Sequence, residues 1–94
     1  MIKVTAIEKA EPYVIVCRFN NNMVKKLDIL PLIENHKNLD GIEKLLDIET
    51  FSKVRVGELG ELVWDKIIKT TNYKGERETW DYDISPEFAF INSI

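Results

Sequence analysis

The sequence predicts an α+β fold: an antiparallel β-meander of about six strands, with one short amphipathic helix packed on it and a protruding hairpin. Two observations predict the sheet. Short alternating or β-branched stretches recur along the chain, and Asn, Gly or Pro residues separate these stretches. A third observation predicts the helix: apolar residues with clear helical spacing occur around residue 40.

The first third of the chain predicts three strands. Apolar and polar residues alternate from Ile2 to Ala10, as in a half-buried strand, and the run YVIVCRF at 13–19 is apolar on both faces, as in a central strand. Asn20 to Asn22 follow, and asparagine tolerates the positive φ of tight hairpin loops. We therefore expect the next strand, MVKKLDIL, to pair antiparallel with YVIVCRF, and PLIEN to form a short helical turn from Pro31.

The predicted helix spans about Asp40 to Asp47. Asp40 and Glu43 have the spacing of a capping box, which begins a helix at Asp40. Three apolar residues then share one helical face, and we expect this face to pack on the sheet. They are Ile42, Leu45 and Leu46.

After the helix the chain returns to extended structure. The stretch FSKVRV, which begins at Phe51, and the stretch ELVWD, which begins at Glu61, have the composition of strands. Further on, Lys74-Gly75 is a turn signal with β-prone residues on each side. The segment from Lys66 to Tyr82 therefore predicts a hairpin that protrudes from the sheet.

The C-terminal stretch ETWDYDISPEFAFINSI predicts a last strand followed by a short turn or helix that begins at SPE. With a period of two, Trp80, Tyr82 and Ile84 share one face of this strand, and Asp81 and Asp83 share the other. We expect the tail to close the core. Because a last strand is commonly an edge, we also expect it to offer a docking surface for another chain.

Length and composition indicate one domain, residues 1–94, because 94 residues with 45% hydrophobic and 31% charged side chains suffice for one core. A domain of this size gains stability from a partner that covers leftover apolar area, so we expect a homodimer or a protein partner.

The net charge of −3 argues against direct nucleic-acid binding. Cys17 is the only cysteine, which excludes an intramolecular disulfide, and we expect a cytoplasmic protein without a membrane span.

Several short motifs resemble the domain-of-unknown-function family numbered 2442. They are FNNNMVKKLDILPLI, then Phe51, VRV at 54–56, Trp64 and DISPE at 83–87. The chain departs from the family in two ways. Asn22 stands where the family usually has Gly, and the segment from Lys66 to Tyr82 separates the tryptophan from DISPE. Trp64 is the better match to the family tryptophan by its distance from VRV, and Trp80 is the alternative.

The resemblance implies a small bacterial cytoplasmic α+β domain with no established activity and no catalytic residues. Members are sometimes fused to a helix-turn-helix domain, and we do not expect a DNA-binding module attached to this chain. Members are also often encoded beside another small protein, in arrangements that look like toxin–antitoxin pairs.

The residues themselves offer no convincing catalytic, metal or cofactor site, so we expect no enzyme activity, no bound metal and no cofactor. His36 is the only histidine and lies in the polar loop ENHKN, which favours a solvated side chain. Cys17 lies in an apolar strand, which favours an inert buried thiol. No serine has the setting of a nucleophile, and the glycines fit no phosphate-binding loop. Asp81 and Asp83 have the spacing of an acid/base pair, but a charged edge that discourages aggregation is the favoured interpretation.

We therefore expect a small protein-interaction module, either the antitoxin-like member of a two-gene pair or a homodimeric accessory domain. The predicted partner-binding residues are Tyr73, Arg77 and Trp80, because these residue types most often anchor protein contacts. Two alternatives stay open. One is a small-molecule-sensing domain with a pocket between the helix and the sheet, and the other is a weak nucleic-acid binder acting through the Lys66 to Trp80 hairpin.

Overall fold

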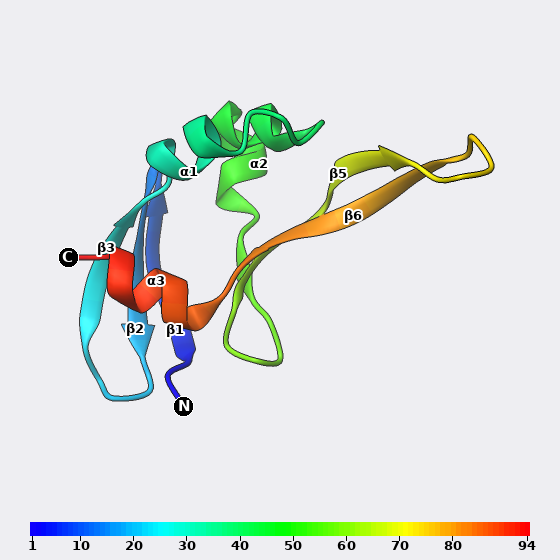
Figure 1. Ribbon diagram of the computed structural model, residues 1–94. Helices are drawn as coiled ribbons and strands as arrows, with labels where there is room; N and C mark the ends of the chain where they lie inside the picture. Colours follow the sequence, from blue (N-terminus) through cyan, green and yellow to red (C-terminus); the bar gives the residue numbers. More distant parts are fainter.

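The computed structural model describes residues 1–94 and shows an α+β fold with two antiparallel three-stranded sheets and three α-helices (Figure 1). The predicted class is confirmed, but the prediction of a single six-stranded meander is wrong. The two sheets meet without a shared ladder: the N–H of Val4 donates to the carbonyl of Gly60 at 3.0 Å, in the loop between two strands of the second sheet. Two short helices and a 3₁₀ turn also separate the third strand from the fourth, so the meander is interrupted.

The first sheet is a meander in the order β1-β2-β3. Its strands are β1 (Val4–Glu11), β2 (Val14–Phe19) and β3 (Val24–Asp28). The predicted hairpin is confirmed, because β2 pairs antiparallel with β3 in a register that places Ile15 opposite Leu27. Asn22 adopts the positive φ of 69° that the turn requires. The buried positions of β2 follow a period of two and face the core.

Two short helices and a 3₁₀ turn connect the sheets. They are α1 (Leu30–Asn35), the 3₁₀ turn η1 (Ile42–Leu46) and α2 (Ile48–Ser52). The helical turn at Pro31 is confirmed in α1. The prediction of one helix from Asp40 to Asp47 is wrong: η1 has Gly41 at its N-cap, and Asp47 starts a second helix by accepting a hydrogen bond from the N–H of Thr50 at 3.0 Å.

The second sheet has the order β4-β5-β6. Its strands are β4 (Arg55–Val56), β5 (Leu62–Thr71) and β6 (Arg77–Ile84). The predicted strand FSKVRV is thus only two residues long, because Phe51 belongs to α2. The tail forms α3 (Pro86–Asn92), and Ser85 caps it by accepting from the N–H of Phe88 at 3.1 Å. Ile94 then exchanges two backbone hydrogen bonds with Lys26 at the edge of β3.

Both sheets contribute to one hydrophobic core of 18 buried residues. Trp64 is its largest side chain, and the indole N–H donates to the carbonyl of Phe51 at 3.0 Å, so the ring is buried without an unpaired polar atom. The predicted packing face of the helical segment is correct for Ile42 and Leu45, which are buried. It is wrong for Leu46, which is 45% exposed, because a 3₁₀ turn does not hold i and i+4 residues on one face as an α-helix does.

We expect Leu45→Ala to lower the free energy of unfolding by about 2 kcal/mol or more, because the side chain is fully buried and its removal leaves a cavity. The neighbouring substitution Leu46→Ala is the matched control, since that side chain is already half in solvent, and it should cost well under half as much. Urea denaturation followed by circular dichroism measures both. Equal losses for the two variants would show that Leu45 does not anchor the helical segment.

Candidate functional site

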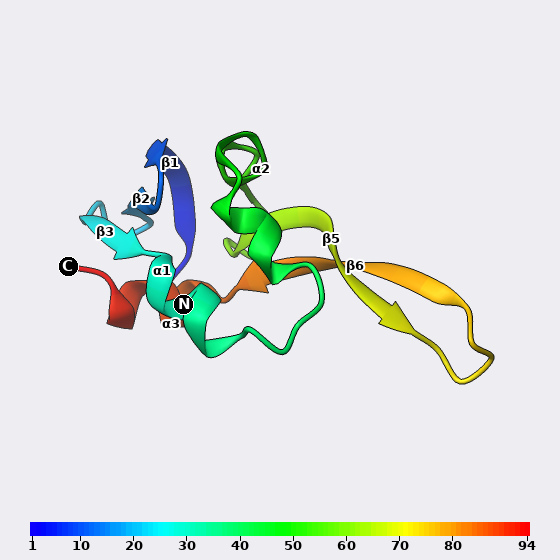
Figure 2. The same cartoon turned by 90° about the horizontal axis from the view of Figure 1, so that it is seen from above.

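The outer part of the β5–β6 hairpin, residues 69–80, extends away from the body of the protein, and we call it the arm. Both cartoon views show the two strands projecting to one side, beyond every other element (Figure 1, Figure 2). The arm accounts for the elongated shape, with a longest dimension of 46 Å against 25 and 21 Å in the other two directions. The prediction of a protruding hairpin between Lys66 and Tyr82 is therefore confirmed, with its turn at Gly75, where φ is 80°.

The arm begins at a bulge in β5. Trp64 pairs with Tyr82 and Ile68 pairs with Trp80, so three residues of β5 lie opposite Asp81 alone. Lys66 adopts a positive φ of 54° in this bulge, and its N–H donates to the carboxylate of Asp81 at 3.0 Å. Bulges bend a strand and increase its twist. The hairpin therefore changes direction after the buried Trp64–Tyr82 pair, and it leaves the core after Ile67 and Ile68, which are still buried.

The bulge also separates the aromatic residues of β6. Tyr82 and Ile84 are 7% and 4% exposed, as predicted for the inner face, but Trp80 is 53% exposed. The alternation of β6 runs unbroken from Ile84 to Trp80, but the burial of that face ends before Trp80, because this part of the strand belongs to the arm. Trp80 instead lines a surface groove together with Asp81 and Asp83.

The loop before η1 holds the base of the arm against the body. The N–H of Lys69 donates to the carbonyl of Asp40 at 2.8 Å, and a Cβ at Gly41 would lie 1.9 Å from the carbonyl oxygen of Ile67. Gly41 also has a φ of 108°, which side chains rarely adopt. Only a glycine at this position allows the loop to cover the edge of β5.

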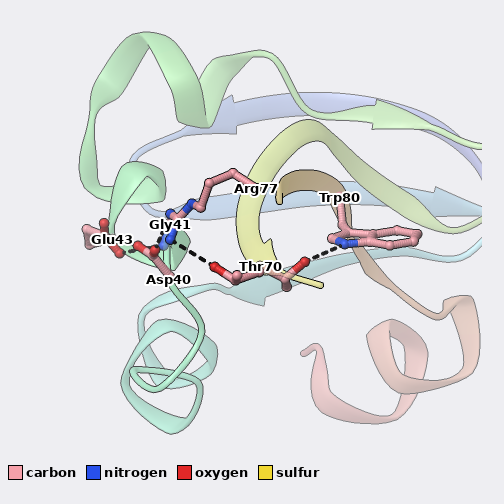
Figure 3. Close-up of polar contacts among 7 residues, drawn as sticks. Asp40, Gly41, Glu43, Thr70, Arg77 and Trp80 are labelled. Carbon is pink, nitrogen blue, oxygen red and sulfur yellow. Dashed lines mark hydrogen bonds and ion pairs between the residues drawn. The ribbon is translucent and has the colours of Figure 1, made fainter. Parts of the chain in front are cut away.

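Side chains add a second connection at the same place, drawn in Figure 3. The guanidinium of Arg77 reaches the carboxylate of Asp40 at 3.1 Å and the hydroxyl of Thr71 at 3.4 Å. Both charged side chains are more than half exposed, so water screens the ion pair and it contributes little to stability. Its effect is to orient Arg77 across one face of the arm.

The structure places all three predicted partner-binding residues on the arm but does not gather them into one site. Tyr73 is 93% exposed at the tip. Arg77 and Trp80 are three residues apart on β6, so they project from opposite faces of the strand. The indole N–H of Trp80 donates to the hydroxyl of Thr70 at 2.8 Å, which fixes the exposed ring on its face (Figure 3).

The groove beside Trp80 has a volume of about 610 Å³ and an acidic lining. Its residues are Arg55, Gly57, Glu58, Leu59, Glu61, Val63, Lys66, Trp80, Asp81 and Asp83. The guanidinium of Arg55 forms two hydrogen bonds with Asp65, at 2.8 and 2.7 Å. These bonds lower the pKa of the Asp65 carboxyl and raise the pKa of Arg55. Because Arg55 is already paired, the groove presents mainly negative charge.

His36 lies in a different environment from the predicted solvated loop. Its Nδ1 is 2.8 Å from the hydroxyl of Tyr82, and the two rings meet edge to face with centroids 5.9 Å apart. Burial, and to a smaller extent the charge of Asp83, raises the pKa of Tyr82 to about 12. The tyrosine therefore stays protonated at neutral pH, and the pair is a structural hydrogen bond. No signal in the sequence connects residues 46 positions apart, so this contact was not predictable.

The other candidate groups behave in simpler ways. Cys17 is fully buried, and burial raises the pKa of its thiol to about 11, which agrees with the predicted inert role. No three His, Cys, Asp or Glu side chains gather in a way that would hold a metal ion. No helix combines the length and the apolar character needed to cross a membrane.

An apolar groove of about 600 Å³ lies between α1 and η1. Leu30, Pro31, Ile33, Ile42 and Leu46 line it, and charged side chains surround it. The small-molecule hypothesis expected a closed pocket between a helix and the sheet. This groove lies between two helical elements and is open to solvent, so it does not have that form.

Gly41→Ala should destabilise the protein by about 3 kcal/mol or more, because the added Cβ would collide with backbone and the residue would keep a strained φ. Gly75→Ala is the matched control: its φ of 80° is also positive, but no atom lies within 4 Å of the new Cβ, so the cost should be about 1 kcal/mol. Thermal unfolding of the two variants measures the difference. Similar melting temperatures would mean that the loop does not clamp the arm as described.

Replacing Tyr82 by Phe should change how stability depends on pH. The unfolded tyrosine loses its proton near its ordinary pKa of 10.0, whereas the folded one holds it until about 12, so wild-type stability falls as pH rises through this window. At pH 7 Tyr82→Phe should cost about 1 kcal/mol through the lost hydrogen bond to His36. Urea unfolding at pH 7 and pH 11 should show the gap between the two proteins closing. A gap that is unchanged at high pH contradicts the assignment.

Comparison of the chain with protein-family models, with curated proteins and with solved structures finds no match. The resemblance to family 2442 therefore stays a prediction from short motifs. Their positions in the fold are nevertheless clear, since Phe51 and Trp64 form the aromatic centre of the core and Ser85 caps α3. The function must be argued from the geometry of this chain.

Proposed function

We propose that this protein is a small non-enzymatic interaction module and that the arm is its docking element. The observation that supports this proposal is the arm itself, which projects from the core (Figure 1) and exposes the side chains of Tyr73 and Trp80. An isolated two-stranded ribbon is only marginally stable in water. A ribbon with two exposed aromatic rings gains most when another chain covers it.

The charge around the arm favours a protein partner over a nucleic acid. Arg77 is paired with Asp40, and Glu76 and Glu78 lie among the cations of the hairpin. The groove beside Trp80 adds further carboxylates, and the whole chain has a net charge of −3. A phosphate backbone approaching Trp80 would meet this negative field. The weak nucleic-acid alternative therefore has little electrostatic support.

The chemistry of the buried groups gives an enzyme still less support. The only histidine is hydrogen-bonded to a tyrosine with a raised pKa, and the only cysteine is fully buried. Neither has an acidic or basic partner that would activate it. The partner of the module is either a second copy of the chain or a different small protein. The resemblance to family 2442 implies the second case, with this chain as the antitoxin-like member of a two-gene pair, whereas a homodimeric accessory domain needs only the chain itself.

We expect the double substitution Tyr73→Ala/Trp80→Ala to weaken association, with itself or with a partner, by about tenfold or more, because aromatic anchors dominate protein contacts. Both side chains are at least half exposed, so far-ultraviolet circular dichroism should not change. The matched control is Ile48→Ala/Ile91→Ala, which removes two side chains that are 65% and 77% exposed on α2 and α3.

Two measurements decide the outcome. Sedimentation velocity of the pure proteins reports self-association, and tagged proteins purified from the native host report a stoichiometric partner. The proposal requires that the arm variant loses the association that wild type and the control variant both keep. If the arm variant keeps every association of the wild type, the arm is not the docking element.

A further inference from the structure

The outer edge of β6 carries a row of backbone groups with no partner. The N–H of Asn72 donates to the carbonyl of Glu76 at 2.9 Å, which fixes the pairing phase at the tip. Antiparallel pairing alternates, so residues 78 and 80 direct their N–H and C=O groups toward β5, and residues 77 and 79 direct theirs outward. The base of the sheet gives the same phase. The N–H of Gly57 donates to the carbonyl of Glu61 at 2.8 Å, so Glu61 directs its backbone groups toward β4. By alternation, residues 62 and 64 direct theirs toward β6, where they pair with residues 84 and 82.

Four residues of β6 therefore point their backbone groups away from the sheet. They are Arg77, Thr79, Asp81 and Asp83. All four are exposed, and no turn, loop or side-chain hydrogen bond uses the backbone of any of them. The outer edge of β5 differs, because β4 covers it at the base and the loop at Asp40 and Gly41 covers it near the arm. In the second sheet β6 is the open edge.

We propose that β6 pairs antiparallel with β6 of a second copy of this chain, which joins the two second sheets into one continuous sheet. The inference rests on the proposed function and names its partner. Adding a strand to an exposed edge satisfies the backbone groups there, and a two-fold axis lets the same strand serve both copies. The residue on that axis is Trp80, in the middle of the unpaired row.

This register is the one that uses the whole row. With Trp80 on the axis, Arg77 lies opposite Asp83 of the second copy and Thr79 lies opposite Asp81, so all four outward residues pair within the strand. With Thr79 on the axis, Asp83 would lie opposite Gly75 in the turn and its backbone groups would leave the ladder.

The charges of the edge agree with the same register. Arg77 meets Asp83 twice, once on each side of the axis, and no carboxylate lies directly opposite another carboxylate. The two Trp80 rings lie beside each other on the axis, where each covers part of the other's exposed surface. The acidic residues of β6, which in isolation discourage edge pairing, here select one register of it.

A charge exchange tests the ionic contact. Sedimentation velocity of the full chain over a wide concentration range should show a monomer–dimer equilibrium, and Arg77→Asp or Asp83→Arg alone should weaken it about tenfold, because each reversal makes two like-charged pairs per dimer. The double variant Arg77→Asp/Asp83→Arg should restore dimerisation to within about threefold of wild type. Asp40→Asn is the control, since it removes the intramolecular partner of Arg77 and keeps every residue of the edge, and it should not weaken dimerisation. Single reversals that dimerise like wild type, or a double variant that is not restored, overturn the proposal.

Cysteine cross-linking tests the register. In this register residue 80 lies directly opposite residue 80 of the second copy, as a pair that is not hydrogen-bonded and therefore approaches closely. Residue 79 lies opposite residue 81 instead, so Trp80→Cys should form a covalent dimer under mild oxidation faster than Thr79→Cys. The native Cys17 is fully buried and should not react. Faster cross-linking through Thr79→Cys overturns the register. A wild-type chain that stays monomeric at every concentration overturns self-pairing, while the Tyr73→Ala/Trp80→Ala comparison in the native host still decides separately whether the arm docks a different protein.

Discussion

The bulge between Trp64 and Ile68 is the feature on which the rest of the molecule's surface depends. Before it, the β5–β6 hairpin is part of the core, where Trp64 and Tyr82 pack with ring centroids 6.0 Å apart. After it, the same two strands form an arm that no other strand flanks. Three residues of β5 opposite one of β6 change the twist at this point, so a single hairpin contributes both a buried wall and an exposed projection.

The bulge would leave a weak joint if nothing supported it, and the loop before η1 provides that support. Gly41 approaches the backbone of Ile67, and Asp40 accepts from Lys69 through its carbonyl and from Arg77 through its carboxylate. The exposed ion pair adds little energy. The backbone contacts matter more, because they exclude water from the edge of β5 and leave β6 as the open edge.

Sequence patterns predicted the elements well where the cause is local. The Asn22 turn, the helical start at Pro31, the Gly75 hairpin and the Ser85 cap all depend on the conformational preference of a residue at its own position. The division into two sheets was not predictable in this way, because it depends on β1 meeting the loop at Gly60 rather than a strand. The exposure of Trp80 was missed for a related reason: a period of two predicts which residues share a face of the strand, but not how far along the strand the core covers that face.

The candidate site shows the same division. Tyr73, Arg77 and Trp80 were predicted because aromatic and cationic residues on a hairpin are typical of protein contacts. The structure places them on the arm, and their role in binding stays a proposal. The open edge of β6 depends on what covers the neighbouring strands, and only the fold contains that information.

The tip of the arm is ordered by the side chain of Asn72, which accepts from the N–H groups of Lys74 and Glu76 at 2.9 and 3.0 Å. An ordered tip loses little conformational entropy on docking, so the arm can bind through a few exposed contacts without a large interface.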